Sequence, residues 1–252
     1  PWALQTPWIF FRLPFFILFA TASAALFLLV YKEDRRLVRW AIVVHYFLFY
    51  SVALIIFRLG FGYDPLIHQT AEQYVVDHGR IFPLQPFYIG QYAVVGLLHY
   101  VTGISVQLID RLLLPVLTVI SLPSIAWYGL THAYGVHPRI ARLIVCFLPI
   151  FSLPLLTFTT PYNLTVLYTL WWVFLLPLLI RGNKGEQIGV CMIAVAAAVT
   201  HPLLGVPLVF MSIVGVCCKR YEPLFSQSTR LFATLGLATC ISTLIVGMLA
   251  AY

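Results

Sequence analysis

A cluster of ionisable side chains lies between Gly60 and Gly90, in a chain that is otherwise strongly apolar. Within it, Asp64, His68 and Glu72 follow one another at intervals of four residues. Residues four apart lie on the same face of an α-helix, so these side chains would form one polar stripe. A carboxylate beside an imidazole can move a proton, and the same pair can bind a divalent cation such as Mg or Mn. We expect this stripe to carry the chemistry of the protein.

The residues that flank the stripe predict a helix over 64–78. Asp64 is a favoured N-cap residue, and Pro65 is tolerated at the first helical position. Gly79 directly follows this segment and would end the helix in a left-handed conformation. Because most apolar residues of the segment fall away from the stripe, the helix is amphipathic and suited to lying on a membrane face.

Each residue of the stripe also has a purely structural interpretation. Asp64 would be a helix cap worth about 1 kcal/mol, His68 an interfacial polar residue, and Glu72 part of an exposed helix face. A cap does not require His68 and Glu72 on the same stripe, so we favour Asp64 as a general base or metal ligand. The membrane edge would raise the pKa of Asp64 towards the working pH.

Composition predicts an all-α, polytopic membrane protein. The residues are 62% hydrophobic and only 9% charged, which excludes an ordinary soluble domain. The apolar runs are long enough for about eight transmembrane helices. The net charge of +7 does not indicate a nucleic-acid partner, because the basic residues lie in short loops between apolar runs. The chain stops inside an apolar run at Tyr252, and we expect it to be a fragment of a longer protein.

The predicted spans are 8–31, 37–57, 106–130, 140–158, 164–180, the two arms of 188–218, and 230–252. Segment 188–218 could instead be one kinked helix. The hairpin, turning at His201–Pro202, is favoured because it places all but four of the fifteen Lys and Arg on one side. The positive-inside rule then makes that side cytoplasmic. This places Asp64 on the external face of a plasma membrane.

The sequence predicts one transmembrane domain over 1–252, with a long external loop at 58–105. Segment 91–103 is apolar but too short to cross, so the loop would contain two juxtamembrane helices. The hairpin arms, taken as about 13 to 16 residues, would reach only about 20 to 24 Å. The His201 turn should therefore form the floor of a recess below the outer surface.

Several side chains near this loop could bind an anionic group. Arg111 could hold a phosphate through two donors, or form an interfacial pair with Asp110. His201 could contact the same phosphate or serve as a polar turn residue. Arg58 and Arg80 are further candidates. His68 and Glu72 would contact the rest of the substrate.

The stretch 62–65, Gly-Tyr-Asp-Pro, directly follows the span 37–57 and opens a first external loop with two juxtamembrane helices. This arrangement resembles the GT-C class of membrane glycosyltransferases, which includes the catalytic subunit of oligosaccharyltransferase, protein O-mannosyltransferases and aminoarabinose transferases. The resemblance covers about 37–218. The segment 159–163 lacks the acidic residue that some members carry in their second external loop.

The resemblance implies a function and a role for one residue. In the class, an acidic residue early in the first external loop activates the acceptor or helps to hold a divalent ion, and Asp64 is the matching position. It implies transfer of a sugar from a polyprenyl-phosphate donor in the bilayer to an acceptor glycan, lipid or protein. A divalent cation held by Asp64 and His68 would be the cofactor.

A transporter or channel and a non-catalytic scaffold subunit are the alternative functions. A transporter would show intramembrane charges along a path and inverted repeats. The chain has few such charges and no visible repeat, and its polar residues cluster in one external loop. In a scaffold subunit, the polar stripe would have no chemical role.

Overall fold

The computed structural model describes residues 13–32, 35–56, 64–81, 86–152 and 155–220. Within these ranges the chain forms helices and turns without any strand, which confirms the all-α prediction. The longer helices are α1 (Leu13–Lys32), α2 (Arg35–Ile56), α5 (Val106–Tyr128), α6 (Pro138–Ser152), α7 (Pro161–Leu175), α9 (Lys184–Thr200) and α10 (Pro202–Arg220).

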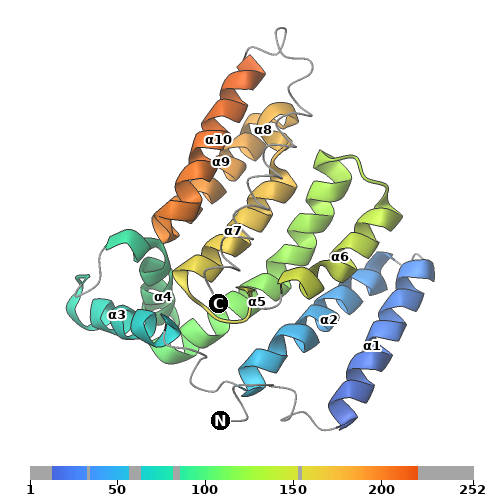
Figure 1. Cartoon of the computed structure of the whole chain (residues 1–252), viewed down its shortest axis with the longest axis horizontal. Helices are drawn as coiled ribbons and strands as arrows, with labels where there is room; N and C mark the ends of the chain where they lie inside the picture. Colours follow the sequence, from blue (N-terminus) through green and yellow to red (C-terminus); the bar gives the residue numbers. More distant parts are fainter. Residues whose placement is uncertain (1–12, 33–34, 57–63, 82–85, 153–154, 221–252) are drawn as a thin grey trace.

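These helices lie side by side, and successive ones run in opposite directions (Figure 1). The end of α1, the start of α2 and the turn joining α5 to α6 lie at one end of the bundle, together with the short helix α8 (Leu178–Arg181). The α9–α10 turn lies at the other end. The basic turns predicted to share one side therefore meet at one end.

Buried aromatic side chains join neighbouring helices. The hydroxyl of Tyr46 on α2 donates to the carbonyl of Val145 on α6 at 2.7 Å. The indole of Trp172 on α7 donates to the hydroxyl of Ser212 on α10 at 2.8 Å. The rings supply apolar contact while their polar tips are hydrogen-bonded, so burial leaves no polar group unpaired at either contact.

The outside of the bundle is apolar. Large exposed side chains occur along several helices, including Ile17, Leu28, Phe47, Ile120 and Phe210. Among the described residues, two segments are long and apolar enough to cross a membrane, Leu13–Tyr31 and Val106–Ala133. Contiguous exposed apolar surface of this kind suits contact with lipid. These features indicate membrane association, and the arrangement with about eight spans stays a prediction.

Two shorter helices lie in the segment where the sequence predicts a juxtamembrane pair. Helix α3 runs from Asp64 to His78 and α4 from Ile89 to Thr102, preceded by the 3₁₀ turn η3 (Pro86–Tyr88). Both are followed by a glycine in the left-handed conformation, Gly79 at φ 66° and Gly103 at φ 70°. This confirms the predicted limits of 64–78. Helix α3 packs on α4 and α5, and α4 also contacts α9 (Figure 1).

The hairpin at His201–Pro202 is confirmed, but both of its arms are longer than predicted. Helix α9 begins at Lys184 because Asn183 and Glu186 form a reciprocal capping box. Arms of 17 and 19 residues span about 25 and 28 Å. The turn therefore lies less deep relative to a hydrocarbon core of about 30 Å than the sequence suggested.

The arms approach very closely. A Cβ atom added to Gly205 would lie 2.1 Å from the backbone nitrogen of Ala198. At the turn itself, a Cβ atom on Gly90 of α4 would lie 2.5 Å from the hydroxyl of Thr200. The missing side chains allow α4, α9 and α10 to meet beside His201.

Three other predicted boundaries differ in the structure. Helix α6 ends at Ser152 instead of residue 158. Helix α7 begins at Pro161, and Thr160 caps it by accepting a hydrogen bond from the Asn163 backbone at 3.1 Å. The predicted span 164–180 is divided between α7 and α8 around Pro177, which lacks the N–H that a continuous helix would need. The predicted span 230–252 lies outside the described residues.

Candidate active site

Asp64 is the first residue of α3, and its side chain is 65% exposed. Its Oδ1 lies 3.4 Å from Nε2 of His68, one helical turn further on. Hydrogen bonding to His68 lowers the pKa of Asp64 below its ordinary value, although partial burial acts in the opposite direction. The prediction that this pKa is raised is therefore wrong, and the carboxylate is ionised at neutral pH.

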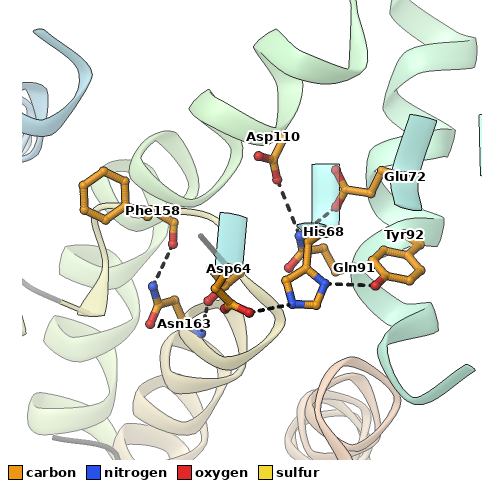
Figure 2. Close-up of polar contacts among 9 residues, drawn as sticks. Asp64, His68, Glu72, Gln91, Tyr92, Asp110, Phe158 and Asn163 are labelled. Carbon is orange, nitrogen blue, oxygen red and sulfur yellow. Dashed lines mark hydrogen bonds and ion pairs between the residues drawn. The ribbon is translucent and has the colours of Figure 1, made fainter. Parts of the chain in front are cut away.

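His68 is buried and joins Asp64 to α4. Its Nδ1 lies 2.9 Å from the hydroxyl of Tyr92 (Figure 2). Because an ionised carboxylate only accepts, the tautomer of His68 that carries its proton on Nε2 donates to Asp64 and accepts at Nδ1 from Tyr92. Burial raises the pKa of Tyr92, which keeps the phenol protonated as a donor. The chain Tyr92–His68–Asp64 thus fixes the orientation of the exposed carboxylate.

The α9–α10 turn lies beside this chain. The ring of Tyr88 is 5.0 Å from that of His68 and 5.7 Å from that of His201, measured between centroids. The Tyr162 ring also contacts His201, in an edge-to-face arrangement with the ring centroids 5.9 Å apart. His201 also contributes to lowering the pKa of Asp64. The structure therefore brings together three predicted site residues, Asp64, His68 and His201.

Glu72 completes the predicted stripe but is only 1% exposed, so an exposed helix face does not explain it. Gln91 on α4 is fully buried and donates from Nε2 to Glu72 Oε1 at 2.7 Å. The same nitrogen lies 3.5 Å from Asp110 Oδ1 on α5 (Figure 2). One side-chain amide therefore links two buried carboxylates from different helices.

The two carboxylates cannot both be ionised at low cost. Burial, and then the nearby Asp110, raise the pKa of Glu72 well above its ordinary value. No Lys or Arg within the described ranges forms an ion pair with either carboxylate. Glu72 Oε2 and Gln91 Oε1 also lack a hydrogen-bond partner there. Burial and the neighbouring Asp110 therefore favour the protonated form of Glu72, and the cluster links α3, α4 and α5.

Of the arginine candidates that the structure describes, neither Arg111 nor Arg80 forms an ion pair with Asp64. Arg111 donates from Nη2 to the carbonyl of Leu54 on α2, and its Nε is buried without a partner among the described residues. Neighbouring helical residues differ by about 100° in direction, which explains why Arg111 meets α2 while Asp110 meets α4. Arg80 is exposed after α3, and Arg58 lies outside the described residues.

Sequence reasoning missed Gln91 and Tyr92 and assigned Asp110 only to a pair with Arg111. All three lie in apolar runs, where a polar side chain needs a partner inside the protein. The signal available in the sequence was the side-chain amide of Gln91, a polar group at the start of a short apolar helix. Its two partners could not be identified, because Glu72, Gln91 and Asp110 lie on three different helices.

The described part of the chain contains no group of three or more His, Cys, Asp and Glu side chains that could hold a metal ion. Asp64 and His68 supply two candidate ligands, and both ring nitrogens of His68 already have partners. The divalent cation at this pair stays a prediction.

Comparison with known proteins identifies no relative: no family model matches the chain, and neither does any curated protein or solved structure.

Proposed function

We propose that the protein is a GT-C-type membrane glycosyltransferase that moves a sugar from a polyprenyl-phosphate donor to an acceptor. The observation that carries the proposal is the contrast within one pair of residues. Asp64 is exposed and ionised, whereas its partner His68 is buried and fixed by Tyr92. A helix terminus that needs only a cap does not require such support, whereas a reacting carboxylate must be held in a defined orientation.

The proposed reaction uses Asp64 to orient the acceptor hydroxyl and receive its proton. The acceptor oxygen attacks the anomeric carbon, the bond from that carbon to the donor phosphate breaks, and polyprenyl phosphate leaves with the electron pair. Because the lowered pKa makes Asp64 a weak base, proton transfer occurs late, after the new bond has made the hydroxyl more acidic. His68 positions the carboxylate throughout.

His201 and Arg111 are the proposed contacts for the donor phosphate. His201 Nδ1 and Arg111 Nε are both buried and have no hydrogen-bond partner among the described residues. Donors of this kind match phosphate oxygens, and hydrogen bonds to a charged group are the stronger class. Arg58 and Arg80 are further candidates. Asp64 and His68 would also hold a divalent cation once Nε2 of His68 is released from Asp64.

The proposed topology is a multi-pass protein of about eight spans. In support, the basic turns meet at one end of the bundle, and Asp64 lies with α3 at the other (Figure 1). The positive-inside rule makes the Asp64 end external. A site at the bilayer boundary suits a lipid donor, because the polyprenyl chain can stay in the membrane while its headgroup reaches Asp64.

The test is turnover of the purified full chain with a panel of polyprenyl-phosphate-linked sugars, measured as release of polyprenyl phosphate. Asp64→Asn keeps the size of the side chain and removes its charge. We expect turnover to fall by about 10²–10⁴-fold, with donor affinity retained. Asp77→Asn, which alters an exposed carboxylate of the same helix, is the matched control and should keep turnover.

The alternatives give different results in the same comparison. If the protein is a scaffold subunit, Asp64→Asn should leave its function in cells unchanged. A transporter would show a defect in solute movement that is not confined to sugar transfer. Full turnover by purified Asp64→Asn protein would contradict the proposed role of this carboxylate.

A further inference from the structure

A second polar site lies at the opposite end of the bundle from Asp64. A cavity of about 540 Å³ opens between α2, α5 and α6. Its polar lining comes from Arg39, Ser124, Thr131 and Arg142, with Trp127 beside them, and no Asp or Glu of the described residues lines it. The cavity is therefore basic, and it shares no residue with the candidate active site.

Arg142 is the central feature of this cavity. It is only 5% exposed, and its guanidinium carbon lies 5.4 Å from the centroid of the Trp127 ring. The ring offers a cation–π contact but accepts no conventional hydrogen bond. Nη1 of Arg142 is buried and has no hydrogen-bond partner among the described residues. A buried, unpaired guanidinium donor is costly, and a guanidinium remains charged at any physiological pH.

An anion of the right geometry would remove that cost. The planar guanidinium matches two oxygens of one phosphate group. Arg39 lines the same cavity from α2 and is exposed, so it supplies a second positive charge at the rim. The volume of about 540 Å³ is sufficient for a headgroup-sized ligand.

The depth of the cavity identifies the class of ligand more closely. Arg39 and Arg142 each lie one turn inside the start of their helices, about 6 Å from the helix ends. This is the level of headgroups for a bundle that crosses the bilayer, and Trp127 is a residue type enriched there. Basic pockets between helices on the cytoplasmic side can bind anionic headgroups.

We propose that this cavity binds a phosphate group, with Arg142 as its main ligand and Arg39 at the rim. The phosphate can belong to an anionic phospholipid of the membrane or be free inorganic phosphate. The site does not depend on the proposed transferase activity, because it is defined by residues at the other end of the bundle.

The test measures ligand affinity of the full chain in nanodiscs of phosphatidylcholine. One arm titrates phosphatidylglycerol into the discs, and the other adds inorganic phosphate to the buffer. Arg142→Gln should weaken binding by about tenfold or more, the value of one charge-assisted hydrogen bond. Arg139→Gln, which removes the same charge from an exposed position of α6, should change affinity by no more than about twofold.

The two arms distinguish the sources of the phosphate. Saturable binding of phosphatidylglycerol that Arg142→Gln weakens supports a lipid headgroup, and the same result with inorganic phosphate alone supports a soluble anion. Absence of saturable binding in both arms would overturn the proposal. Equal binding by wild type and Arg142→Gln would also overturn it.

A second variant keeps the proposal testable if Arg142→Gln does not fold. Arg39 is exposed, so Arg39→Gln should fold normally. Its affinity should fall several-fold while that of Arg139→Gln does not. Equal losses of affinity for Arg39→Gln and Arg139→Gln would show that general surface charge accounts for the binding, and would overturn the proposal.

Discussion

The two ends of α5 accommodate buried charge in opposite ways. Near its start, Asp110 shares the amide of Gln91 with Glu72, whose pKa is raised by burial. Near its end, the indole of Trp127 supports Arg142, which has an unpaired donor beside a cavity. A carboxylate can be neutralised by a proton, whereas a guanidinium cannot. The acidic end can therefore reduce its charge within the protein by taking up a proton, whereas we propose that the charge at the basic end is matched by a phosphate ligand.

The strongest test of this contrast is to remove the shared amide. Gln91→Leu keeps the approximate volume but leaves Glu72 and Asp110 without their donor, so we expect a loss of about 3 kcal/mol in the free energy of unfolding. The measurement is denaturant unfolding in detergent. Gln73→Leu, at an exposed position of α3, is the matched control and should lie within about 0.5 kcal/mol of wild type. Similar losses for the two variants would show that the cluster does not hold the three helices.

A second test uses pH. Glu72 has a folded-state pKa above its unfolded value, so the folded protein binds more protons and stability should fall as pH rises between the two pKa values. Inside that window the slope is about 1.4 kcal/mol per pH unit, beginning near the ordinary glutamate pKa of about 4.3. Glu72→Gln should flatten this dependence. Asp77→Asn should leave this pH dependence unchanged. A wild-type stability that rises with pH over this window would contradict the raised pKa of Glu72.

The smallest expected effect is at the basic end. In phosphate-free detergent containing no anionic lipid, Arg142→Met removes an unpaired donor and keeps an unbranched apolar side chain, so stability should change by less than about 1 kcal/mol. Adding phosphatidylglycerol should then stabilise wild type but not the variant, measured as the thermal midpoint. A loss as large as that of Gln91→Leu in the lipid-free state would mean that Arg142 is already paired inside the protein.

Local signals in the sequence were sufficient for the boundaries of α3 and for the hairpin. Asp64–Pro65 and Gly79 act through backbone preferences of single residues, and both predictions are confirmed. The distribution of Lys and Arg indicated the His201–Pro202 turn. The length of α9 was underestimated because a polar first turn was interpreted as loop, although Asn183 and Glu186 already formed a capping-box pattern.

The direction of the polar stripe could not be derived from its spacing alone. Spacing places His68 and Glu72 on one face but does not determine whether that face meets solvent or protein. Where the surroundings are lipid, polar side chains turn inward, and both residues are buried against α4. The pKa of Asp64 was mispredicted for a related reason, since the effect of His68 on it exceeds that of burial.

Gly90 lies at a close contact between α4 and the α9–α10 turn. It stands directly before Gln91, and a Cβ atom there would collide with Thr200, the residue preceding His201. The separation between the hairpin tip and α4 is thus set by one hydrogen atom in place of a methyl group. A change of spacing at Gly90 would therefore displace two groups together. One is the imidazole of His201, which faces Tyr88, and the other is the amide of Gln91, which links the two buried carboxyl groups.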